Sequence, residues 1–139
     1  MRIFDSHAHV GAPELLAEAP DLIARARAAD VHGILAVGAG YGIGANAGAV
    51  MLADENAGIW ASVGVHPHDA AKWTDDCAPQ LRERMRHPRL LAMGEIGLDY
   101  HYDFSPRDVQ RRVFVEQLEI AAEAGKPILI HTREAWDDT

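Results

Sequence analysis

The sequence of 139 residues has little of what disulfide-bonded, membrane-spanning or strongly basic proteins need. Cys77 is the only cysteine, so no internal disulfide can form, and we expect a reducing, cytoplasmic setting. No apolar run approaches the roughly 20 residues of a transmembrane helix, and Met1–Asp5 does not lead into a signal peptide, so no membrane partner is expected. Lys and Arg number 13 against 21 Asp and Glu, giving a formal net charge of −8. A phosphate-bearing substrate would therefore need a local source of positive charge.

Hydrophobic residues make up 48% of the chain, which is enough for a folded core. Short apolar runs alternate with stretches of helical periodicity. The expected strands are Arg2–His9, Gly33–Gly38, Gly58–Val65, Leu90–Ile96 and Lys126–His131. The expected helices are Pro20–Val31, Asn46–Asn56, Pro79–Arg86 and Arg107–Gly125.

The last of these helices has the clearest boundary signals. Ser105 is expected to be its N-cap and Pro106 its first helical residue, while Gly125 ends it. Its apolar face is expected to consist of Val109, Val113, Leu118 and Ala122.

Alternation of strands and helices predicts an α/β fold with parallel strands and right-handed crossovers. Two architectures suit this order: an open doubly wound sheet, or a (β/α)8 TIM-type barrel. Five strands and four crossovers cannot close an eight-stranded barrel, which usually takes about 250 residues. Residues 1–139 are thus either a complete small open domain or the N-terminal part of a barrel domain.

His7 and His9 are the first candidate metal ligands. Residues two apart in a strand point to the same face, so both imidazoles can reach one point. Asp5 shares this parity and could orient a ligand from behind. The alternative is a pair of surface or loop histidines.

Two further candidates end other expected strands. Glu95 lies between Gly94 and Gly97 at the end of an apolar strand, where an unpaired buried carboxylate would be costly, and Asp99 follows it. His131 also ends an expected buried strand. The carboxyl ends of parallel strands are the edge where active sites form, so these side chains are expected to share one site.

Other polar residues at this edge admit two interpretations. His66 and His68 could contact substrate or metal, or could belong to a turn set by Pro67. Arg133 could hold a phosphate through its planar fork, or could be a surface charge at a helix start. His32, His87 and His101 have no partner pattern and are expected at the surface. The acidic neighbours of Cys77 argue against a catalytic thiol.

The Gly-rich segment Gly42–Ala47 nominally fits a dinucleotide-binding pattern. The acidic residue that should close a second strand about 20 residues on is missing, so this segment is expected to be an ordinary loop between strand and helix.

With these motifs in place, the sequence resembles the TatD family of metal-dependent deoxyribonucleases, within the amidohydrolase-like (β/α) barrels. The resemblance runs in order along the whole chain and favours the barrel, here as its first five strands and four crossovers. The segments that carry it are Phe4–His9, Gly64–Ala70, Gly94–Asp103, Gln110–Gln117 and Lys126–Ala135.

The resemblance implies two divalent ions, with Mg, Mn and Zn left open. His7 and His9 would bind the first, Glu95 would bridge both, and His131 would bind the second. His66 and Arg133 would lie along the substrate path. The family pattern continues with a histidine ligand and a catalytic aspartate, which would fall beyond Thr139.

The leading hypothesis is therefore a metal-dependent hydrolase of DNA or another phosphodiester, incomplete in this chain. Two alternatives stay open: an inactive truncated product or association module that binds metal weakly, and a barrel hydrolase of a small amide or ester. Self-association through exposed sheet edges is expected if the chain ends at Thr139.

Overall fold

The computed structural model describes all 139 residues as an alternation of strands and helices. The elements are β1 (Ile3–Ala8), α1 (Ala19–Ala28), β2 (Val31–Val37), η1 (Ile43–Ala45), α2 (Asn46–Glu55), β3 (Ile59–Val63), η2 (Pro67–Lys72), α3 (Cys77–Met85), β4 (Leu90–Asp99), α4 (Arg107–Ala124) and β5 (Ile128–Arg133). The two η elements are short 3-10 helices. No helix combines the length and apolar character needed to cross a bilayer.

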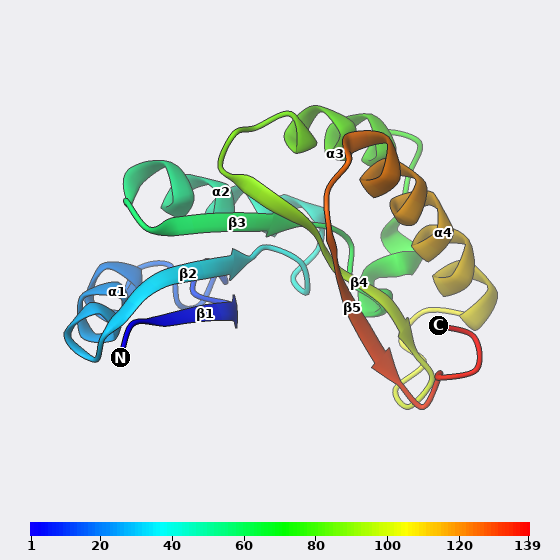
Figure 1. Ribbon diagram of the computed structural model, residues 1–139. Coiled ribbons are helices and arrows are strands. Elements are labelled where there is room, and N and C mark those ends of the chain that lie inside the picture. The colour runs from blue at the N-terminus through cyan, green and yellow to red at the C-terminus, as the bar shows by residue number, and fades with distance from the viewer.

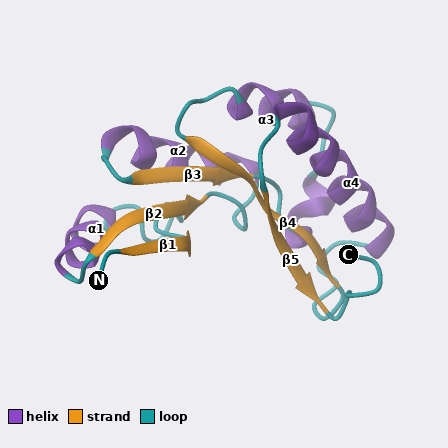
Figure 2. Cartoon of the chain, in the orientation of Figure 1, coloured by secondary structure: helices purple, strands orange, loops and turns teal.

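The five strands form one parallel sheet in the sequential order β1-β2-β3-β4-β5. A doubly wound sheet reverses its strand order partway and carries helices on both faces. Here the order never reverses, and the sheet curves with its helices along the outer side (Figures 1 and 2). The expected partial barrel is confirmed, and the open doubly wound alternative is wrong.

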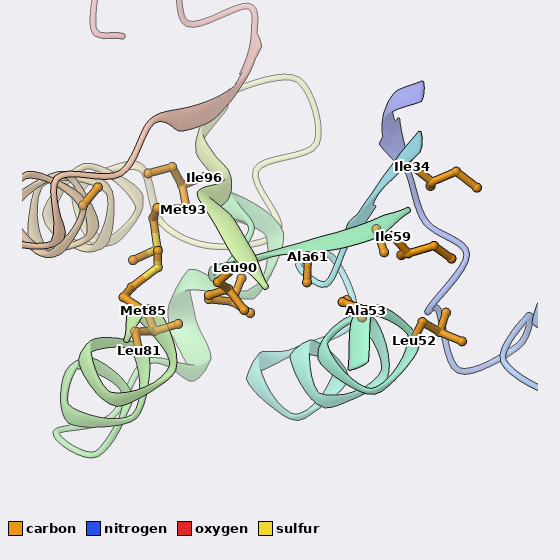
Figure 3. Close-up of a cluster of buried hydrophobic side chains, with 14 of the residues drawn as sticks. Ile34, Leu52, Ala53, Ile59, Ala61, Leu81, Met85, Leu90, Met93 and Ile96 are labelled. Atoms are coloured by element: carbon orange, nitrogen blue, oxygen red, sulfur yellow. The ribbon is translucent and has the colours of Figure 1, made fainter. Parts of the chain in front are cut away.

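The core lies between the outer face of this sheet and the helices. Figure 3 shows Leu52 of α2 beside Ile59 of β3, and Leu81 and Met85 of α3 below Met93 of β4. Twenty buried apolar residues form one continuous cluster from α1 to α4, so the helices share one core with the sheet.

The two outer strands are much less covered than the inner ones. Every residue of β1 is exposed or partly exposed, and Ile130 of β5 is 49% exposed. The expectation that His131 ends a buried strand is wrong, because β5 is an edge strand with only β4 as its neighbour.

Helix α4 differs from the expectation at its start. Pro106, with extended backbone, is the N-cap, and the helix begins at Arg107. The Ser105 hydroxyl is buried, donates to the His68 carbonyl (3.0 Å) and accepts from the Ala71 N–H (2.9 Å). Ser105 therefore connects the loop before α4 to η2 and is not a helix cap.

The buried face of α4 also differs. Val113 is buried as expected, but Val109 and Leu118 are only partly buried and Ala122 is exposed. The residues that face the core are Gln110, Val113, Phe114, Gln117, Ile120 and Ala121.

Candidate metal centre

The sequence-predicted ligands come from three strands and lie at the carboxyl end of the sheet. His7 belongs to β1 and His9 follows it, Glu95 belongs to β4, and His131 belongs to β5. Glu95 is not the last residue of its strand as expected, because β4 continues to Asp99. The structure brings all four side chains together in two adjoining groups.

The first group consists of His7, His9 and Glu95, whose ligand atoms lie within 4.8 Å of one another. The Nε2 atoms of the two histidines are 3.3 Å apart, and the Glu95 Oε2 atom lies 3.4 Å and 3.6 Å from them. As the spacing of two residues predicts, both imidazoles point toward the same position. The Asp5 carboxylate bonds the backbone of His7 and not its ring, since its Oδ1 accepts from the His7 N–H at 3.1 Å.

The second group consists of His66, His68 and His131, again with ligand atoms within 4.8 Å of one another. His131 Nδ1 is 3.0 Å from Glu95 Oε1, so the two oxygens of one carboxylate face one group each. His66, expected along the substrate path, thus lies in the same group as the expected metal ligand His131, and Glu95 joins this group to the first.

Two glycines bring β4 and β5 close enough for this contact. Gly97 has φ +144° and Gly94 φ +148°, a region that L side chains rarely adopt. A Cβ at Gly97 would overlap the carbonyl oxygen of His131, and one at Gly94 would lie 2.6 Å from Leu129 Cβ. The glycines around Glu95 therefore set how near His131 can come to it.

Asp99 is buried behind the second group, and its contacts were not foreseen from the sequence. Its Oδ2 lies 2.8 Å from His68 Nε2 and 3.0 Å from His131 Nε2. Its Oδ1 accepts from the N–H groups of His101 and Tyr102 at 3.1 Å and 3.0 Å. Asp99 thus holds two imidazoles through their ring nitrogens, as carboxylates behind metal-binding histidines do.

The charges in this cluster are coupled. Burial favours the neutral form of Glu95, but hydrogen bonds from His131 and His9 outweigh it and hold the pKa of Glu95 well below its usual range. Burial acts likewise on Asp99, where bonds from the Tyr102 N–H, His68 and His131 lower the pKa of the carboxyl. The hydrogen bond with Glu95 raises the pKa of the His131 imidazole despite burial. The contacts with His131 therefore favour the ionised form of both carboxylates and the protonated form of the imidazole.

The pKa of His66 is shifted in the direction opposite to that of His131. Burial and the nearby His131 lower the pKa of His66 to about 4. Its Nδ1 accepts from the His68 N–H at 3.2 Å, so the proton of the neutral ring lies on Nε2. His66 accordingly offers an N–H donor.

The donor set fits divalent cations. Imidazole nitrogens and carboxylate oxygens are common ligands of Zn, Mn and Mg. Two imidazole Nε2 atoms and a carboxylate oxygen facing one point repel each other unless a proton or cation lies between them. The buried Nδ1 of His9 also has no hydrogen-bond partner, which is unusual for a buried polar atom.

Buried amides hold the strand ends that carry the cluster. Gln117 bonds both the N–H and the carbonyl of Val65, at 2.7 Å and 3.1 Å. Gln110 does the same for Asp99, at 2.8 Å and 3.0 Å, and Asn46 for Gly64, at 3.1 Å and 3.0 Å. Sequence reasoning missed these residues, although the spacing of seven between the two glutamines places them on one face of α4.

Arg133 lies at the rim of the cluster. It is the last residue of β5, so its interpretation as a helix-start charge is wrong. Its side chain forms no ion pair, and its guanidinium lies 5.2 Å from the centre of the Tyr102 ring. A cleft of about 270 Å³ is lined by His9, Gly40, Tyr41, His66, His68 and Glu95. The cleft therefore opens directly onto both ligand groups.

The remaining sequence candidates lie outside the centre. His32, His87 and His101 pair with Asp30, Asp54 and Glu134. Cys77 is buried, and its Sγ accepts from the Thr74 N–H at 3.3 Å. Gly42–Ala47 forms the end of a loop, η1 and the first residues of α2, and the Gly42 N–H donates to Asp69 at 2.7 Å. A larger hollow of about 400 Å³ beside α3 has no converging ligand set.

Comparison with known proteins gives a consistent result. The family model described as TatD related DNase matches residues 4–139. The chain is 38% identical over 136 residues to the Bacillus subtilis uncharacterized metal-dependent hydrolase YabD, covering 98% of the chain and 52% of that protein. It is 38% identical over 134 residues to the 3'-5' ssDNA/RNA exonuclease TatD of Musicola paradisiaca, covering 96% of the chain and 50% of that protein.

A solved structure agrees with these sequence relatives. The crystal structure of YjjV, a TatD homologue from Escherichia coli, superimposes with a TM-score of 0.88 at 28% identity, covering 98% of this chain and 52% of that one. The chain spans about half the length of the curated relatives that it matches.

Proposed function

The chain belongs to the family of TatD-related DNases, and on that premise we propose that its strand-end cluster binds two divalent cations for the hydrolysis of phosphodiester bonds in nucleic acid. The first cation would bind His7, His9 and Glu95, and the second would bind Glu95 and His131. The observation that carries this assignment is the division of the Glu95 carboxylate, with one oxygen toward each group.

When bound, such a pair of cations lowers the pKa of a water molecule and neutralises charge that develops on the phosphoryl oxygens. The chain itself orients and binds. Asp99 fixes the rings of His131 and His68. His66 lines the cleft, and its Nε2–H would donate to a phosphoryl oxygen, while the guanidinium of Arg133 would make a second phosphate contact.

The substrate class follows from charge and from relatives. The net charge of −8 over residues 1–139 disfavours binding of a polyanion across a broad surface of this part, so positive charge would have to be concentrated at the site. The Musicola relative is named a 3'-5' ssDNA/RNA exonuclease, which supports single-stranded nucleic acid as the substrate. The family resemblance implies a catalytic aspartate that lies outside residues 1–139. Because of that role, we propose that hydrolysis needs it.

The experiment that tests this function joins residues 1–139 to the second half of the Bacillus subtilis relative, replacing the half that aligns. We expect the chimera to cleave single-stranded DNA with Mn²⁺ or Mg²⁺, and the His131→Ala chimera to lose at least a hundredfold in rate, by analogy with the loss of other essential site groups. A Val115→Ala chimera, altered on the exposed side of α4, is the matched control. A folded chimera that binds metal and leaves DNA intact would contradict the proposal.

Two lesser assignments go with this function. The buried free thiol of Cys77 supports a cytoplasmic location, which fractionation of cells producing a tagged protein would test. For residues 1–139 produced alone, we propose self-association through β1 and β5, whose backbone and side chains are exposed.

A further inference from the structure

Two exposed aromatic rings lie beside the candidate metal centre. Tyr102 and Phe104, on the loop between β4 and α4, stack with their ring centres 5.2 Å apart and their planes at 14°. They are 48% and 66% exposed, although the chain has only three Phe and three Tyr. Large aromatic side chains left in solvent next to a polar cleft mark a binding surface more often than scattered exposed residues do.

The loop that carries the rings is held in place. The Tyr102 N–H donates to the buried carboxylate of Asp99, and Arg107 forms bidentate hydrogen bonds with Asp103. Ser105, directly after Phe104, is buried and ties the loop to η2 through two hydrogen bonds. The rings are thus preorganised, which lowers the entropy lost when a ligand stacks on them.

The rings also adjoin the groups that would bind phosphate. His68 meets Tyr102 and Phe104 edge to face, at 5.6 Å and 4.8 Å between ring centres, and belongs to the second ligand group. The unpaired guanidinium of Arg133 lies 5.2 Å from the centre of the Tyr102 ring. An aromatic face, a free cation and a candidate metal site therefore lie side by side. A nucleotide could place its base on the aromatic face and its phosphate at the cation and the metal site.

We propose that Tyr102 and Phe104 form a base-stacking subsite for the nucleobase next to the scissile phosphate of single-stranded nucleic acid. This inference rests on the proposed function and deepens it. A base in a duplex is already stacked on its neighbours, so the rings would favour unpaired ends. Every base has a π-face, so the subsite would accept DNA and RNA of any sequence.

The test measures binding and not turnover. The chain is titrated into a labelled oligothymidylate, or into a labelled abasic oligonucleotide of equal length, and fluorescence anisotropy measures its binding. Each titration is done in Ca²⁺, with and without EDTA. We expect the base-bearing oligonucleotide to bind more tightly, and Phe104→Ala to weaken its binding about 5- to 140-fold. The preference over the abasic oligonucleotide should vanish in Phe104→Ala, persist in Phe104→Trp and fall in Phe104→Leu, which keeps the apolar volume without the ring.

Val115→Ala, which trims an exposed side chain on α4, should keep the full preference, and circular dichroism checks that each variant is folded. Equal binding of both oligonucleotides that EDTA abolishes would overturn the stacking subsite and leave the proposed function standing. A preference that Phe104→Leu retains would likewise overturn it. If neither oligonucleotide binds in an EDTA-sensitive way, the proposed function fails and the subsite with it.

Discussion

At the scale of residues, Glu95 is the side chain on which both ligand groups depend, because each of its oxygens faces a different group. We expect Glu95→Gln to weaken binding at both cation sites by at least about tenfold, whereas His7→Ala mainly weakens the first. Isothermal titration with Mn²⁺ measures the two sites separately. Equal losses at both sites in both variants would contradict the bridging role.

Asp69 is a second residue whose environment makes a measurable prediction. Burial favours its neutral form, but Lys72 at 2.6 Å and the Gly42 N–H at 2.7 Å outweigh it and lower the pKa of the carboxyl. Its stabilising effect is thus present above the unfolded pKa of about 3.9 and is lost as the pH falls through the folded value. We expect Asp69→Asn to lower the free energy of unfolding by about 1–3 kcal/mol at pH 7, with the difference shrinking below about pH 4.

Urea denaturation at several pH values checks this prediction, with Asp75→Asn as the control because Asp75 is exposed and forms no ion pair. If the difference in free energy of unfolding between Asp69→Asn and the unsubstituted chain grew as the pH fell, the carboxylate contacts would not stabilise the fold.

At the scale of elements, the close approach of β4 and β5 depends on Gly97. Because a Cβ there would overlap the His131 carbonyl, and because φ is +144°, we expect Gly97→Ala to cost at least about 2 kcal/mol and to weaken metal binding at His131. Thermal denaturation and Mn²⁺ titration measure the two effects. Gly44→Ala is the control, since no atom lies within 4 Å of its added Cβ. Equal stability of the two variants would refute the packing argument.

Elements also show how far the sequence could predict this protein. The spacing of His7 and His9, and the places of Glu95 and His131 after apolar runs, were sufficient to predict which side chains meet, although β4 and β5 continue beyond them to Asp99 and Arg133. The face of α4 could not be read from hydrophobicity, because Gln110 and Gln117 are buried to satisfy strand-end backbone groups. Ser105 has the sequence pattern of a helix cap, yet its hydroxyl satisfies loop groups that only the tertiary fold brings near.

At the scale of the whole molecule, the edges of the half-barrel govern behaviour in solution. We expect residues 1–139, produced alone, to form dimers or larger species, because β1 and β5 present unpaired backbone next to the exposed Phe4 and Ile130. Size-exclusion chromatography with light scattering measures this, and Ile130→Lys should shift the population toward monomer. Val115→Lys, on the outer side of α4, should leave it unchanged. A stable monomer at high concentration would contradict the edge argument.

The central proposal is that the carboxyl end of this sheet would hold two cations that share Glu95. Anomalous diffraction from crystals grown with Mn²⁺ tests it most directly, because it locates each ion without reference to activity. The account predicts two peaks about 3.5–4 Å apart on either side of the Glu95 carboxylate, one beside His7 and His9 and the other beside His131. The absence of any peak at Glu95, or a His131 ring turned away from it, would contradict the claim.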